Sequence, residues 1–228
     1  AVFFSTDYFF NLCALFVELL MKDMKDMKGR DAVKAGTVGS VANVKNPPLL
    51  YFGGKWRMGP LLVSLFPEHT TYVEPFGGGA SVLLQKPRSK TEVYNDLDDD
   101  VVNLFAVLRD EKKAARLVRA VTLTPWSRAE YLAAFAQSDE PVERARRLVV
   151  RSSMGFGSRA LYGGKSSFRS DYRSVDLWYQ TYPRQLAATA ARLRGVVVEK
   201  MSTFDLSGLL EQSLGVSWRR PFQRTTNC

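Results

Sequence analysis

Two glycine-rich segments and one acidic segment follow one another closely in this chain and could build a single ligand site. Residues 51–56 read Tyr-Phe-Gly-Gly-Lys-Trp, residues 73–80 read Val-Glu-Pro-Phe-Gly-Gly-Gly-Ala, and residues 93–96 read Val-Tyr-Asn-Asp. Glycine lets backbone approach a ligand closely, and a helix beginning after the second turn would face a polar or negative group. Asp96, at the end of the next strand, could accept hydrogen bonds from both hydroxyls of a ribose. The order predicts a nucleotide-shaped pocket.

These residues alone leave three interpretations open: a nicotinamide dinucleotide enzyme, another nucleoside-binding enzyme, or a tight turn without a ligand. Residues 77–82, Gly-Gly-Gly-Ala-Ser-Val, lack the third glycine of the dinucleotide fingerprint. Glu74, just before the turn, suits a cationic or amine-bearing ligand better than a pyrophosphate. Both observations count against the dinucleotide enzyme.

The surrounding pattern predicts an α/β fold that positions these segments. Apolar spacing favours a helix at 56–66, short strands at 71–74 and 91–95, and a helix at 80–85 between the strands. Three consecutive aspartates then begin a helix that runs from 98 to about 121. Strand, turn, helix, strand and helix in this order open a doubly wound sheet.

Residues 122–195 are predicted to form a separate, mainly helical lobe inserted into that sheet. We expect helices at 127–137, 142–153 and 175–194, with a loop rich in glycine, serine, arginine and aromatic residues after the second of them. Residues 196–199, Val-Val-Val-Glu, are typical of a buried strand and return the chain to the sheet.

The charge of the chain favours a polyanionic partner. The net charge is +9 and the isoelectric point is near 9.6. Between residues 141 and 173 there are eight basic residues and two acidic ones, so nucleic acid is the simplest partner, with a solvated basic face as the alternative. With one histidine in the chain, a His-rich metal site and a Ser-His-Asp triad are poor interpretations. The two cysteines lie near opposite ends and form no disulfide framework, so a reducing cytosol is expected.

Taken together, the three segments closely resemble the Dam-like family of adenine-specific DNA methyltransferases, over about residues 47–212. The resemblance implies S-adenosylmethionine as cofactor, a Rossmann-like methyltransferase sheet and methyl transfer to the exocyclic amine of adenine. It implies that residues 52–55 contact the methionine end, that residues around the second glycine turn line the cofactor, and that Asp96 holds the ribose. The implied cofactor residues are Tyr51, Phe52, Gly53, Gly54, Lys55, Glu74, Pro75, Phe76, Gly77, Gly79 and Asp96.

The same resemblance places target recognition in the basic lobe. Arginine and lysine neutralise phosphates, and aromatic side chains can wedge between bases or stack on them. We therefore expect double-stranded DNA as partner, in a monomeric cytoplasmic protein with no membrane span, with a cognate restriction endonuclease as a further partner. The residues expected to bind DNA are Arg151, Arg159, Tyr162, Lys165, Arg169 and Arg173.

One motif of the family is absent from the 228 residues. Its catalytic Asp-Pro-Pro-Tyr should follow residue 212 within about a dozen positions, but residues 213–228 are unrelated in character. Residues 46–49, Asn-Pro-Pro-Leu, lack the aromatic and precede the first cofactor segment, so we interpret them as a lead-in turn. A frameshift or early end after residue 212, or a natural remnant that binds without catalysis, would each explain the absence. We therefore expect little or no methyl transfer and assign no catalytic or metal-binding residue.

The predicted organisation has five parts. Residues 1–45 are a tail or upstream segment, with a docked amphipathic helix as the alternative. Residues 46–121 bind the cofactor, 122–195 recognise DNA, 196–212 return to the sheet, and 213–228 form an aberrant tail.

Overall fold

The computed structural model describes residues 44–51, 53–66, 68–156, 168–203 and 205–206. All of them belong to one compact unit, Gly39–Cys228. Nearly all of the predicted N-terminal tail and the whole of the predicted aberrant C-terminal tail lie outside the described residues.

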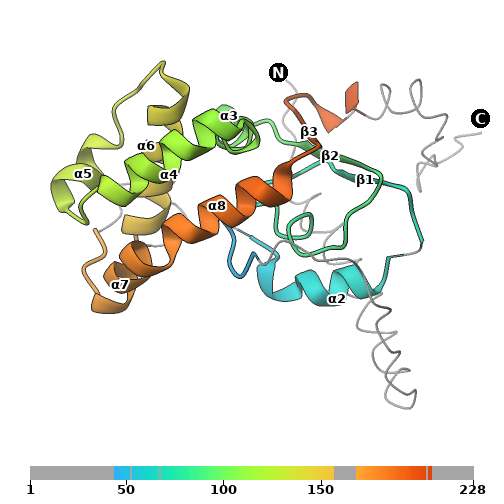
Figure 1. Ribbon diagram of the computed structural model, residues 1–228, viewed down its shortest axis with the longest axis horizontal. Coiled ribbons are helices and arrows are strands. Elements are labelled where there is room, and N and C mark those ends of the chain that lie inside the picture. Colours follow the sequence, from blue (N-terminus) through green and yellow to red (C-terminus); the bar gives the residue numbers. More distant parts are fainter. Residues whose placement is uncertain (1–43, 52, 67, 157–167, 204, 207–228) are drawn as a thin grey trace, which may run out of the picture. The chain divides into compact units, whose positions relative to one another are not determined.

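The sheet has three parallel strands in the order β1-β2-β3 (Figure 1). The strands are β1 (Thr71–Glu74), β2 (Thr91–Asn95) and β3 (Val196–Glu199). All three strands were predicted at these bounds. In the register, Val73 lies opposite Val93, which lies opposite Val197 on its other side. Because the strands are parallel, the segments that leave β1 and β2 emerge at the same edge of the sheet.

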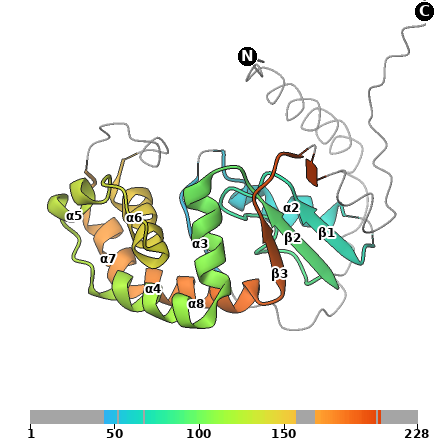
Figure 2. The same ribbon diagram turned by 90° about the horizontal axis from the view of Figure 1, so that it is seen from above.

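The helices precede β1 or connect β2 to β3 (Figures 1 and 2). Before β1 stand the 3₁₀ turn η1 (Trp56–Met58) and α2 (Gly59–Ser64), where a helix was predicted. Among the described residues, no helix has both the length and the apolar character needed to cross a membrane. The connection from β2 to β3 contains α3 (Asp99–Arg109), α4 (Glu111–Leu123), α5 (Arg128–Ala133), α6 (Pro141–Met154), α7 (Tyr172–Gln180) and α8 (Tyr182–Leu193).

Two predicted long helices are each broken in the structure. The helix predicted over 98–121 is interrupted at Asp110, whose backbone is extended and whose carboxylate accepts a hydrogen bond from the Lys113 N–H. The helix predicted over 175–194 is interrupted at Thr181, and α8 restarts with a proline in its first turn. In both places the apolar spacing continues across the break, so periodicity alone did not reveal it.

Two shorter predicted helices also need correction. Residues 80–85 form consecutive turns rather than a regular helix, and Ala80 at their start has a positive φ of 52°. The segment predicted as a helix over 127–137 is helical only as α5, which Ser127 caps by accepting a hydrogen bond from the Glu130 N–H. The predicted helix over 142–153 is confirmed as α6.

One hydrophobic core joins the sheet and the helices. Tyr94 of β2, Phe105 of α3 and Trp178 of α7 belong to the same cluster of buried side chains. The predicted boundary between residues 121 and 122 falls inside α4, whose buried Leu117 and Val121 belong to this cluster too. The structure is therefore a mixed α/β fold with a small parallel sheet, and the division into a cofactor part and an inserted lobe stays a prediction.

A buried group of three charged residues fixes the sheet to α8. Glu92 of β2 accepts hydrogen bonds from Lys86 (2.8 Å) and from Arg192 (2.6 and 2.9 Å), and all three side chains are at most 2% exposed. Burial by itself would raise the pKa of Glu92, but the hydrogen bonds from the two cations hold it below its usual value. Arg192 also donates to the carbonyl of Leu83, which follows the glycine turn. The three residues thus join three parts of the chain.

We expect Glu92→Gln to destabilise the fold by about 3–5 kcal/mol, because it leaves two buried cations without a compensating charge. The matched control is Glu111→Gln, which removes an exposed ion pair with Arg194 at 3.6 Å and should cost less than about 1 kcal/mol. Urea unfolding of the two variants measures the difference. Equal losses would show that the buried charges are not needed.

Candidate functional site

The candidate site lies where β1 and β2 end, and the end of β2 holds the glycine turn in place. The Tyr94 hydroxyl donates to the carbonyl of Gly78 (2.7 Å), and the Gly77 N–H donates to the carbonyl of Asn95 (2.8 Å). The Gly78 N–H donates to Oδ2 of Asp96 (2.7 Å). Three successive residues of β2 and its end therefore fix two successive glycines.

The Asn95 side chain adds a third loop to this arrangement. It is 1% exposed, and its Nδ2 donates to the carbonyls of Pro75 and Met201, both at 3.0 Å. Its Oδ1 accepts from the Met201 N–H at 3.0 Å. The loops after all three strands are thus joined through one buried amide. The sequence analysis did not select Asn95, although a side-chain amide at the end of a buried strand is a signal that could have identified it.

The glycines of the turn are required by two tyrosines. A Cβ atom on Gly77 would lie 2.0 Å from the Tyr94 ring, and one on Gly78, whose φ is +46°, would lie 2.8 Å from the Tyr51 ring. The contact between Tyr51 and Gly78 also brings the first glycine-rich segment against the second. The two segments therefore adjoin in space, and ring packing explains these two glycines without a ligand.

Glu74 faces the chain that leaves the turn. Its Oε2 accepts hydrogen bonds from the Leu83 N–H (2.8 Å) and the Tyr72 hydroxyl (3.2 Å). Burial raises the pKa of Glu74 to about 7, although these hydrogen bonds act in the opposite direction. In this structure Glu74 binds the backbone that follows the glycine turn, at Leu83, and its predicted contact with a cofactor stays a prediction.

Asp96 joins the glycine turn to the loop that follows β2, and each of these two segments carries an exposed apolar side chain. Its Oδ1 accepts from the Asp98 N–H (3.0 Å) and its Oδ2 from the Gly78 N–H. Within the described residues, these two bonds leave part of the acceptor capacity of a carboxylate unused. Phe76 and Leu97 are each 62% exposed. The sequence analysis did not select Leu97 as a site residue. The signal that could have identified it is that it is the one apolar residue among the polar and acidic residues 95–100.

The first glycine-rich segment borders a cavity of about 560 Å³. Tyr51 and Gly54 line it together with Ser81, Ser152 and Arg169. The cavity therefore brings two predicted cofactor residues next to a predicted DNA-binding arginine.

The rest of this segment lies close by. The Gly54 N–H donates to the carbonyl of Tyr51 (3.0 Å), which closes the turn. Lys55 donates from Nζ to the carbonyl of Gly53 (2.7 Å). Phe52 lies outside the described residues.

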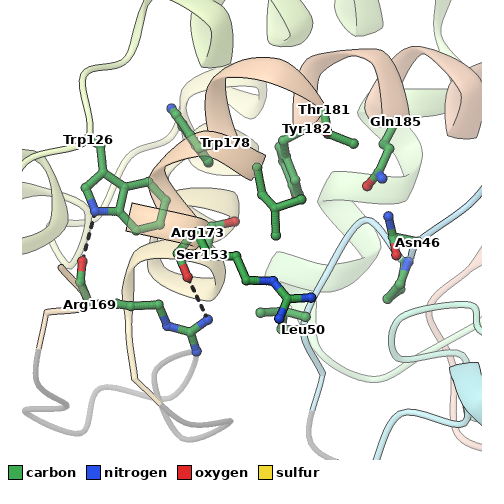
Figure 3. A pocket seen from close by; sticks show the side chains of 13 residues that line it. Asn46, Leu50, Trp126, Ser153, Arg169, Arg173, Trp178, Thr181, Tyr182 and Gln185 are labelled. Carbon is green, nitrogen blue, oxygen red and sulfur yellow. Dashed lines mark hydrogen bonds between the residues drawn. The ribbon is translucent and has the colours of Figure 1, made fainter. Parts of the chain in front are cut away.

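The predicted DNA-binding residues have different surroundings. Arg151 is 14% exposed and forms an ion pair with Asp100 at 2.7 Å, while Asp100 also pairs with Arg144 at 2.6 Å. Burial would raise the pKa of Asp100, but the two arginines hold it below its usual value. Arg169 and Arg173 line a second cavity (Figure 3). The remaining three predicted residues, Arg159, Tyr162 and Lys165, lie outside the described residues.

A parallel sheet with a glycine turn after one strand and a carboxylate after the next is the arrangement of α/β enzymes that bind a nucleoside-containing ligand. Residues 51–202, more than half of the chain, match the model of the D12 class N6 adenine-specific DNA methyltransferase family. The chain therefore belongs to this family, which confirms the resemblance drawn from the three segments. No curated protein matches the chain.

The raised pKa of Glu74 predicts a specific dependence of stability on pH. The folded protein holds the proton more tightly than the unfolded chain, whose Glu pKa is near 4.5. The resulting stabilisation is complete below about pH 4.5 and is lost as the pH rises through about 7. Relative to Glu74→Gln, the wild type should lose on the order of 1–3 kcal/mol between pH 5 and pH 8.

Urea unfolding of both proteins at four pH values checks this expectation. Taking the difference between the two proteins removes the contribution of groups that titrate equally in both. A difference that stays constant from pH 5 to pH 8 would contradict the assignment.

Proposed function

We propose that this chain binds S-adenosylmethionine at the carboxyl ends of β1 and β2 and double-stranded DNA beside it, as a DNA adenine methyltransferase does. The observation that carries the proposal is the glycine turn held against the end of β2 by Tyr94, Asn95 and Asp96. A turn fixed before the ligand arrives lowers the cost of ordering it on binding.

The chemistry of the residues around Asp96 fits a nucleoside. The remaining acceptor capacity of its carboxylate suits ribose hydroxyls. Phe76 and Leu97 offer exposed apolar surface for a purine on the two loops next to it. Tyr51, Gly53, Gly54 and Lys55 would face the methionine end of the cofactor. Pro75, Gly77 and Gly79 would shape the turn that it rests on.

S-adenosylmethionine supplies an electrophilic methyl group on a sulfonium. The chain would bind it, orient it and keep it next to the cavity lined by Tyr51 and Arg169. An adenine inside a duplex cannot reach such a site, so the target base has to leave the stack. Arg169, in the wall of this cavity, is suited to hold the backbone on either side of that base.

Methyl transfer itself also requires acceptors for the adenine amine and an aromatic for the flipped ring. The family resemblance assigns these roles to Asp-Pro-Pro-Tyr, which does not occur in residues 1–228. We infer that these residues by themselves bind without transferring a methyl group. A role in binding DNA or cofactor without catalysis is therefore the second candidate function.

Asp96→Ala should weaken binding of S-adenosylmethionine by roughly 10- to 100-fold, because hydrogen bonds to a charged group contribute about 1.5–3 kcal/mol. Isothermal titration calorimetry measures the change. The matched control is Asp99→Ala, which removes an exposed carboxylate paired with Lys200 at 2.5 Å and should bind as the wild type does. Thermal unfolding of Asp96→Ala separates loss of the contact from loss of the fold. Unchanged affinity in folded Asp96→Ala would refute the ribose assignment.

The purified 228-residue chain should transfer no methyl group to duplex DNA, because the amine acceptors and the stacking aromatic are missing. Incubation with methyl-labelled S-adenosylmethionine and duplex DNA, followed by nucleoside analysis, checks this. Cofactor binding measured on the same sample shows that the chain is folded. Labelled N6-methyladenine would show that other residues carry out the chemistry.

A further inference from the structure

We propose that the cavity in Figure 3 is a second binding site that takes one nucleoside 5′-monophosphate unit, separate from the cofactor and from the target adenine. The cavity has a volume of about 270 Å³. It lies between the segment at residues 46–50 and the helices α6, α7 and α8. None of its lining residues belongs to the glycine turn or to the end of β2.

Three aromatic side chains give the cavity flat, fixed walls. Trp178 and Tyr182 are stacked with ring centres 5.4 Å apart, and Trp126 meets Trp178 edge-on at 5.8 Å. The indole N–H of Trp126 donates to the carbonyl of Arg169 (2.8 Å), and that of Trp178 donates to the carbonyl of Thr124 (3.0 Å). The rings therefore have set positions before a ligand enters. Walls of this kind favour a planar heteroaromatic ring, and the stacking depends little on which base supplies that ring.

Two arginines make the cavity a site for an anion. Arg173 is exposed and extends across the cavity in Figure 3. Within the part of the chain that the structure describes, its guanidinium forms no hydrogen bond or ion pair. Arg169 uses one terminal nitrogen on the Ser174 hydroxyl (3.4 Å). No carboxylate lines the cavity. A guanidinium with free donors next to aromatic walls suits a phosphate attached to a base.

Gln185 adds a group that can recognise the edge of a base. The residue is only 8% exposed, yet it lines the cavity, and its amide points toward Asn46 in Figure 3. No side-chain hydrogen bond of Gln185 is found within the described residues. An amide that faces the cavity offers both a donor and an acceptor to a ligand. Side-chain amides match the edge of adenine with two hydrogen bonds.

The cavity, at about 270 Å³, is small beside the usual range of about 300–1,000 Å³ for ligand pockets, so one nucleotide suits it better than a larger ligand. The same unit could come from two sources, either a free nucleotide or a nucleotide of a DNA strand that has left the stack.

The first test is calorimetry with deoxyadenosine 5′-monophosphate, with S-adenosylhomocysteine in excess so that the cofactor site is blocked. The wild type should bind, and Arg173→Ala should bind at least tenfold more weakly because the phosphate loses its cation. Deoxyadenosine, which lacks the phosphate, should bind the two proteins equally. The matched control is Arg184→Ala, which removes an exposed arginine of α8 that does not line the cavity.

Repeating the titration in the Asp96→Ala background separates this proposal from the proposed cofactor site. Monophosphate binding that survives Asp96→Ala but not Arg173→Ala supports the second site, whether or not S-adenosylmethionine binds. Equal affinities in Arg173→Ala and Arg184→Ala, or no binding by the wild type, would overturn it. Arg173 is exposed, so its replacement should not unfold the protein.

A competition experiment then identifies the source of the nucleotide. If the site holds a nucleotide of a DNA strand, saturating duplex DNA should displace the bound monophosphate from the wild type. If the site takes free nucleotides, DNA and monophosphate should bind together. Both results support the second site, and they distinguish its two possible ligands.

Discussion

The arrangement of the candidate site depends on how β2 ends. The side chains of Tyr94 and Asp96 both reach Gly78, and the side chain of Asn95 reaches Pro75 and Met201. Together they hold the carbonyl of Gly78, the carbonyls of Pro75 and Met201, and the N–H of Gly78. The loops after all three strands therefore have one common support. Loss of the Asn95 amide would leave buried backbone groups without partners and release two loops at once.

A second constraint acts at the other end of the same strand. Glu92 binds Lys86 and Arg192 where water is excluded, and Arg192 extends this contact to Leu83 behind the glycine turn. The glycine turn is thus bound by the end of β2, and the segment that follows it is bound by Arg192 of α8. Because α8 belongs to the same hydrophobic core as the sheet, the helices contribute directly to the geometry of the candidate site.

Arg169 connects the two cavities. It lines both the cavity beside Tyr51 and the cavity of Figure 3, as do Pro47 and Leu50. The segment at residues 46–50, which includes the predicted lead-in turn 46–49, thus contributes to the walls of both cavities. The Tyr182 hydroxyl donates to the Pro48 carbonyl of this segment. A ligand in one cavity would change the surroundings of Arg169 in the other. This gives a physical route by which occupancy of the two could be coupled.

The sequence by itself determined the features that depend on residues close together in the chain. All three strands, the glycine turn, the aspartates at the start of α3 and the family follow from local pattern and spacing, because these features need little information from distant parts of the chain. Only the tertiary structure decided the rest. The helices predicted over 98–121 and 175–194 each end and restart, at Asp110 and Thr181, although the apolar spacing continues across both positions. Arg151 pairs with Asp100, which is 51 positions away, and Glu74 turns toward Leu83 rather than outward. Side-chain charge is visible in a sequence, but the partner that neutralises it is chosen by packing.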